Sequence, residues 1–82
     1  MIPYGRQDIN QDDIDAVIEV LNSDFITQGP LGPLFEQTVA NYCNANFAVS
    51  ASSATAGLHI ACLALDLGPG DWLWTSPNTF VA

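Results

Sequence analysis

Small and hydroxyl-bearing residues fill the point where a short apolar stretch passes into a helical pattern, in the run Ser52-Ser53-Ala54-Thr55-Ala56-Gly57. The first N–H groups of a helix have no partner within it and the helix dipole is positive there, so a phosphate can bind without a lysine. Ala54 and Thr55 are small enough to let a phosphate approach, and the hydroxyls of Ser53 and Thr55 can donate further hydrogen bonds. The alternative is that the hydroxyl residue is only an N-cap, which is the commoner role of Ser or Thr at this place.

A second candidate is Phe80, which follows the next apolar stretch. Ligands of open α/β sheets bind outside the carboxyl ends of the strands, and an aromatic ring there can stack on a flat cofactor. Ordinary packing is the alternative for this ring. His59 lies more than a turn into the helical pattern, so we interpret it as structural rather than as an acid-base catalyst.

The charge balance of the chain excludes several classes of partner. Its 82 residues include 9 acidic residues and one basic residue, Arg6, which gives a formal net charge of −8. We expect no nucleic acid partner, because binding to a phosphate backbone depends on Lys and Arg. An anionic membrane surface is disfavoured for the same reason. With no lysine at all, the chain cannot supply a Schiff-base lysine, so we expect no catalytic residue within it.

Hydropathy and cysteine content indicate a globular cytoplasmic protein. Hydrophobic residues make up 49% of the chain, which is unlike the composition of disordered proteins. No apolar run approaches the roughly 20 residues of a membrane span, and no signal peptide pattern is present. Cys43 and Cys62 lack metal-ligand spacing, so we interpret them as buried reduced thiols.

The elements that must position these residues begin with a helix capped by Asn10. Asp12, Asp13 and Asp15 crowd its first turn, where the helix dipole favours negative charge. This explains the acidic cluster more simply than a metal site, and we expect no metal. Four apolar residues follow at helical spacing: Ile14, Val17, Ile18 and Leu21. We expect this helix to end at Asn22-Ser23.

Further elements follow in the order helix, strand, helix, strand. They are a helix from Pro33 to about Asn44, a strand at 47–51, a helix after Ser53, a turn at Gly68–Asp71, a strand at 72–75 and the start of a helix at 79–82. Strand, helix and strand form a βαβ unit, so we expect an α/β fold with a mostly parallel sheet flanked by helices. Two strands do not make a stable sheet. We therefore expect a fragment that continues beyond Ala82 and folds poorly alone.

Several motifs in a fixed order carry a family resemblance. They are Phe25–Pro30, Ser52–His59, Leu67–Asp71 and Thr75–Ala82. On these residues the chain resembles the DegT/DnrJ/EryC1/StrS nucleotide-sugar aminotransferases, which are pyridoxal 5'-phosphate (PLP) enzymes of the aspartate aminotransferase fold (fold type I). The start, Pro3–Ile9 and Asp12–Asp15, is most similar to a branch that acts in pseudaminic acid biosynthesis. The resemblance implies an N-terminal arm with two helices at 1–46 and the start of the large PLP-binding domain at 47–82.

The resemblance also implies roles for individual residues. Ala54 and Thr55 match the pair that holds the PLP phosphate, next to Ser53, and Phe80 matches the residue that stacks over the pyridine ring. The positions that match the nucleotide-sugar site are Tyr4, Asp24, Phe25, Ile26, Thr27 and Ala54. Trp72 and Trp74 replace residues that are more usually charged and aliphatic, and we assign them to packing or subunit contact.

For the full-length protein, the resemblance implies transfer of an amino group from L-glutamate to C4 of a UDP-linked 4-keto-6-deoxy-N-acetylhexosamine. It also implies a homodimer and a catalytic lysine beyond Ala82. One alternative is a dehydratase of the same family, dependent on pyridoxamine phosphate, in which histidine replaces that lysine. The other is a truncated binding module without catalysis.

Overall fold

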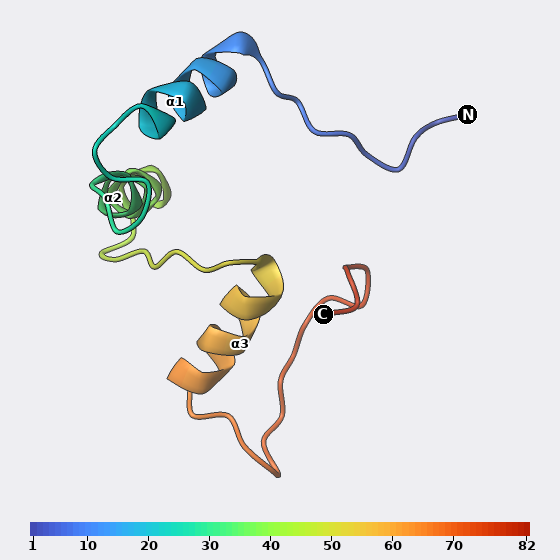
Figure 1. The fold of residues 1–82 in the computed structure, drawn as a ribbon. Helices are drawn as coiled ribbons and strands as arrows, with labels where there is room; N and C mark the ends of the chain where they lie inside the picture. The colour runs from blue at the N-terminus through green and yellow to red at the C-terminus, as the bar shows by residue number, and fades with distance from the viewer. The chain divides into compact units, whose positions relative to one another are not determined.

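The computed structural model describes residues 1–82 as three helices joined by irregular segments (Figure 1). The helices are α1 (Gln11–Leu21), α2 (Leu31–Cys43) and α3 (Ala54–Ala64). The chain divides into two compact units, residues 1–35 and residues 36–82. The expected boundary at residues 46 and 47 stays a prediction about the domain organisation.

The start of α1 is fixed by a reciprocal capping box, which confirms Asn10 as the N-cap. The N–H of Asp13 donates to Asn10 Oδ1 at 3.1 Å, and the N–H of Asn10 donates to Asp13 Oδ2 at 3.0 Å. This satisfies two backbone donors at the helix end. Gln11 Nε2 also donates to Asp15 Oδ1 at 2.8 Å. Two of the first-turn carboxylates therefore act in local hydrogen bonds of the helix.

The second helix, α2, begins at Leu31, two residues before the expected start at Pro33. Pro33 occupies its third position, where a missing N–H costs no intrahelical bond. The helix ends at Cys43, and Asn44 follows it with a φ of +52°. There the N–H of Ala45 donates to Ala40 O at 2.8 Å and the N–H of Asn44 donates to Asn41 O at 3.2 Å, a Schellman motif.

The third helix, α3, ends at Ala64 and is closed by the same motif, in which Asp66 has a φ of +56°. The N–H of Leu67 donates to Cys62 O at 3.1 Å, and the N–H of Asp66 donates to Leu63 O at 3.0 Å. The expected turn follows, because Asp71 N–H donates to Gly68 O at 3.1 Å and Gly68 N–H donates to Asp71 Oδ2 at 2.8 Å. The hydrogen bonds at Asp66 end the helix, and the turn then reverses the direction of the chain (Figure 1).

The expected strands and sheet are not present, and this part of the α/β prediction is wrong for the chain as it stands. Residues 47–51 and 72–75 are irregular, and residues 79–82 form no helix. A strand exists only through hydrogen bonds to a neighbouring strand, and a parallel pair is rarely stable without both faces covered. No such cover reaches these segments, since Phe47 and Val49 are 88% and 77% exposed.

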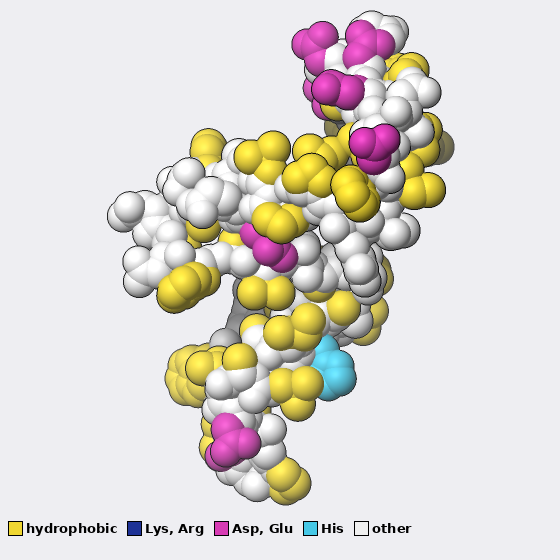
Figure 2. Space-filling model, turned by 60° about the vertical axis from the view of Figure 1, so that its left-hand side comes forward, with side chains coloured by type: hydrophobic (Ala, Val, Ile, Leu, Met, Phe, Trp, Pro, Cys, Tyr) yellow, Lys and Arg dark blue, Asp and Glu magenta, His cyan; other side chains and the backbone are white.

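The hydrophobic side chains of the helices lie mostly on the surface. Ala40 is the one buried hydrophobic residue, and hydrophobic side chains spread over the visible face in Figure 2. The apolar residues of α1, from Ile14 to Leu21, lie in a helix as expected. These two residues are nevertheless 45% and 65% exposed. Each helix therefore forms from local signals and presents an uncovered apolar face.

The two cysteines are less buried than expected. Cys43 is exposed and Cys62 is half-buried, so the interpretation of both as buried thiols is wrong. Cys43 lies at the end of α2, where no other element covers it. None of the three helices has the length and apolar character needed to cross a bilayer.

Candidate functional site

The junction before α3 has the geometry of a capped helix N-terminus. Ser53 is the N-cap, with extended backbone angles of φ −159° and ψ 163°, and its Oγ accepts from the N–H of Ala56 at 3.1 Å. The N–H of Gly57 donates to Ser53 O at 3.0 Å. The N-cap interpretation of Ser53 is therefore confirmed. Its hydroxyl hydrogen can still be donated to a ligand.

The N–H groups of Ala54 and Thr55 stay available after this capping. The two donors that follow them, at Ala56 and Gly57, are taken by Ser53, and no protein acceptor is bonded to the N–H of Ala54 or Thr55. Both residues are exposed. Two adjacent free donors at the positive end of a helix dipole, beside the hydroxyl of Thr55, form an arrangement that binds an oxyanion.

A cavity of about 740 Å³ begins at this helix end and runs along α3. Its wall on the helix side comes from Ala54, Thr55, Leu58, His59 and Cys62. Its opposite wall comes from residues 73, 75–77 and 79–82. Both walls belong to the unit of residues 36–82. Segments that are 25 residues apart, around Thr55 and Phe80, therefore border one space.

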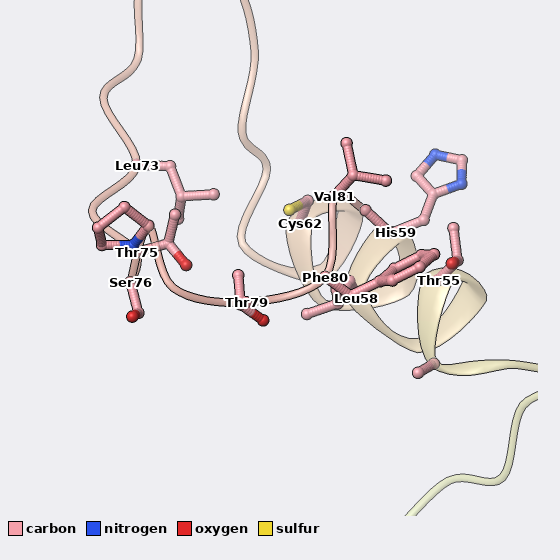
Figure 3. Close-up of a pocket in the computed structure, with 13 residues that line it drawn as sticks. Thr55, Leu58, His59, Cys62, Leu73, Thr75, Ser76, Thr79, Phe80 and Val81 are labelled. Atoms are coloured by element: carbon pink, nitrogen blue, oxygen red, sulfur yellow. The ribbon is translucent and has the colours of Figure 1, made fainter. Parts of the chain in front are cut away.

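Phe80 and His59 differ in how they face this cavity (Figure 3). The ring of Phe80 extends from the C-terminal segment toward the first turns of α3, where Thr55 lies. The imidazole of His59 points away from the other labelled side chains, although His59 is among the residues that line the cavity. An apolar ring beside a free oxyanion-binding helix end can hold a flat anionic ligand by stacking and by hydrogen bonds together.

One polar contact ties the segment before the site to α2, and sequence reasoning missed it. Oε1 of Glu36 accepts from the backbone N–H of Ser50 and from Ser50 Oγ, both at 2.8 Å. These two hydrogen bonds, the backbone one first, lower the pKa of the Glu36 carboxyl from its ordinary value against a small opposing effect of desolvation. The partners are 14 residues apart, and no motif or spacing in the sequence signals such a pair.

The loop 24–27 lies in the other unit, after α1. The hydroxyl of Ser23 donates to Val20 O at 2.7 Å and lies 3.2 Å from Phe25 O. Gln28 takes a left-handed conformation with φ +52°. A Cβ on Gly29 would lie 2.8 Å from Phe25 Cβ, so a glycine is required for this tight turn. The loop is thus held by backbone constraints rather than by packing.

The residues expected at the sugar site have these surroundings within residues 1–35. Ile26 borders an apolar groove of about 300 Å³ together with α1 residues such as Val17 and Val20. Phe25 is 60% exposed and Tyr4 is fully exposed. Asp24 and Thr27 are also exposed. The structure thus brings Ala54, Thr55 and Phe80 to one cavity of the second unit. Ser53 precedes them as the N-cap of α3, and the roles of all these residues stay predictions.

Comparison with known proteins gives the family. Residues 7–82 match the model of the DegT/DnrJ/EryC1/StrS aminotransferase family. The chain is 43% identical over 81 residues to a UDP-4-amino-4-deoxy-L-arabinose–oxoglutarate aminotransferase of Shewanella sediminis, and 42% identical over 81 residues to an uncharacterized protein of Methanocaldococcus jannaschii. Each alignment covers 99% of this chain and 21% of the relative. No solved structure matches. With a family match over nearly all of its length, this chain belongs to the DegT/DnrJ/EryC1/StrS aminotransferase family.

Proposed function

We propose that this chain supplies the phosphate-binding residues Ser53, Ala54 and Thr55, here called the phosphate cradle, in a PLP-dependent nucleotide-sugar aminotransferase. It also supplies one wall of the cofactor site. The observation that carries the proposal is the α3 N-terminus, where the free N–H groups of Ala54 and Thr55 border the same cavity as Phe80. Family membership makes an aminotransferase the activity to test. The chain spans about a fifth of the length of the relatives it matches.

The residues present fit the phosphate and the ring of PLP. A phosphate dianion needs several donors, and the cradle offers two backbone N–H groups and two hydroxyls, from Ser53 and Thr55. Its small side chains leave the helix end open. Leu58 and Phe80 offer an apolar surface to the ring. When bound, PLP supplies the electron sink for amino-group transfer.

In this proposal each part of the chain has a defined task. The α3 N-terminus binds the phosphate and fixes the position of the cofactor. Phe80 covers one face of the ring and excludes water from it. Tyr4 and the loop 24–27 contact the nucleotide sugar, together with Ala54. The catalytic lysine is a residue that this chain lacks, so residues 1–82 alone should be inactive.

The finer proposal concerns the substrates. We propose a UDP-linked 4-keto-6-deoxy-N-acetylhexosamine as amino acceptor at C4, in pseudaminic acid biosynthesis, because Pro3–Ile9 and Asp12–Asp15 resemble that branch. The corresponding enzyme is UDP-4-amino-4,6-dideoxy-N-acetyl-β-L-altrosamine transaminase. L-Glutamate is proposed as donor. The name of the Shewanella relative supports this, since oxoglutarate is the keto acid of glutamate. A cytoplasmic homodimer completes the proposal.

The decisive experiment uses the protein expressed from its full reading frame with Thr55→Ala and Thr55→Ser. PLP affinity is measured by fluorescence titration and stability by thermal unfolding. A hydrogen bond to a charged group is worth about 1.5 kcal/mol or more, so Thr55→Ala should weaken PLP binding about tenfold. Thr55→Ser keeps the hydroxyl and should bind nearly as the parent does. Equal affinities for all three proteins would contradict the phosphate role, and no PLP binding by the parent would contradict the function.

A further inference from the structure

The Glu36–Ser50 contact is the polar anchor of the segment that leads into the cofactor site. Between Ala45, which closes the end of α2, and the cap at Ser53, hydrogen bonds of the protein reach only Ser50. Both bonds end on one atom, Oε1 of Glu36, at 2.8 Å each. A single carboxylate oxygen therefore fixes the backbone and the side chain of Ser50 at once.

This anchor lies close enough to the cradle to control its position. Ser53 comes three positions after Ser50, a span of at most about 10 Å. Ala54 and Thr55, whose N–H groups are free, come directly after. Phe47 and Val49 are largely exposed, so packing adds little to hold this segment. The hydrogen bonds to Glu36 are thus the main constraint on how α3 is attached to α2 within the unit of residues 36–82.

We propose that Glu36 is a positioning residue for the cofactor phosphate, which it aligns through Ser50 without touching the cofactor. This inference rests on the proposed function, because it takes the α3 N-terminus as the phosphate cradle. Binding sites depend on such supporting contacts, since a cradle held loosely loses part of its affinity to the ordering of its own backbone.

Charge alone predicts the opposite effect. A carboxylate near a phosphate repels it, so a purely electrostatic Glu36 would weaken PLP binding, and any neutral replacement would strengthen it. If Glu36 instead positions Ser50, its effect on PLP binding depends on its acceptor oxygen and not on its charge. Glutamine keeps an Oε1 of the same reach, so it can accept both bonds from Ser50, whereas alanine accepts none.

The test uses the protein expressed from its full reading frame with Glu36→Ala, Glu36→Gln and Ser50→Ala. Dissociation constants are measured for PLP and for pyridoxal, which has the same ring and no phosphate. We expect Glu36→Ala to weaken PLP binding about tenfold, the lower end for supporting residues of a site. Pyridoxal affinity should stay unchanged. Glu36→Gln should match or exceed the parent, and Ser50→Ala should fall between, since its backbone N–H bond survives.

Each outcome has a defined meaning. Equal PLP affinity in Glu36→Ala and the parent would overturn the inference, and so would tighter binding in both Glu36→Ala and Glu36→Gln. An equal loss for PLP and pyridoxal would assign Glu36 to general stability and overturn it as well. If Glu36→Ala fails to fold, the PLP affinities of the other two variants still test the inference. It is contradicted if Ser50→Ala binds PLP as tightly as Glu36→Gln does. A parent that binds no PLP overturns the proposed function itself, which separates the two failures.

Discussion

Residues 1–82, produced alone, should form no cooperatively folded monomer. A folded monomer of 8.8 kDa has an accessible surface of about 4,800 Å², and its unfolded chain exposes about 12,800 Å². The structure exposes 8264 Å² and buries Ala40 alone among its hydrophobic residues. The chain therefore buries little more than half of the area that a domain of its size buries. Three capped helices without a shared core do not offset the conformational entropy of folding.

The assay is a urea titration of the isolated chain, followed by far-UV circular dichroism and by tryptophan fluorescence. The dependence of the unfolding free energy on urea scales with the area exposed, so we expect a shallow loss of helix without a defined midpoint. Trp72 and Trp74 are 90% and 94% exposed. Their emission should therefore match that of tryptophan in water before any urea is added.

A sharp result would refute this reasoning. It would be a single transition, coincident for both probes, with a slope of about 1 kcal/mol/M as expected of a small two-state domain. Sedimentation at several concentrations must accompany it. A transition whose midpoint rises with protein concentration would show that a second copy covers the apolar helix faces, and only a monomeric transition contradicts the prediction.

Three further predictions concern the protein expressed from its full reading frame. Gly29→Ala should strain the turn against Phe25 by about 1–3 kcal/mol and raise KM for the nucleotide sugar, while the PLP dissociation constant stays unchanged. The Ser50 bonds lower the pKa of Glu36, so their stabilising effect is present above the ordinary glutamate pKa and disappears as pH falls through the lowered pKa. NMR titration of the carboxyl carbon, with Ser50→Ala raising that pKa toward the ordinary value, checks this. Asp66→Gly should relieve the left-handed conformation and raise the free energy of unfolding by up to about 1 kcal/mol, measured by urea titration.

The helices and turns were predictable because their signals are local. Asn10 and Ser53 cap helices through hydrogen bonds to the third residue that follows, and the Gly68–Asp71 turn closes within four residues. The free N–H groups of Ala54 and Thr55 were likewise predictable, because they follow directly from a helix start at this place. Local rules of this kind need no knowledge of the remaining fold.

The strands and the Glu36–Ser50 contact depend on partners that are distant in the sequence. Residues 47–51 and 72–75 have the composition of buried strands, yet without neighbouring strands they stay irregular. The Glu36–Ser50 pair joins residues 14 apart across an irregular segment, where side-chain spacing follows no period. The proximity of Phe80 to the α3 N-terminus was expected from the family resemblance, and residue types alone left it open.

The alternation along residues 72–75 has an optical consequence. Leu73 and Thr75 border the cavity, so Trp72 and Trp74 each stand directly beside a residue that lines the proposed cofactor site. Indole emission overlaps the absorption of pyridoxal phosphate, and over so short a separation the excitation passes to the cofactor by resonance energy transfer. Occupancy of the site can therefore be followed by the quenching of these two native fluorophores, without an attached dye and without turnover.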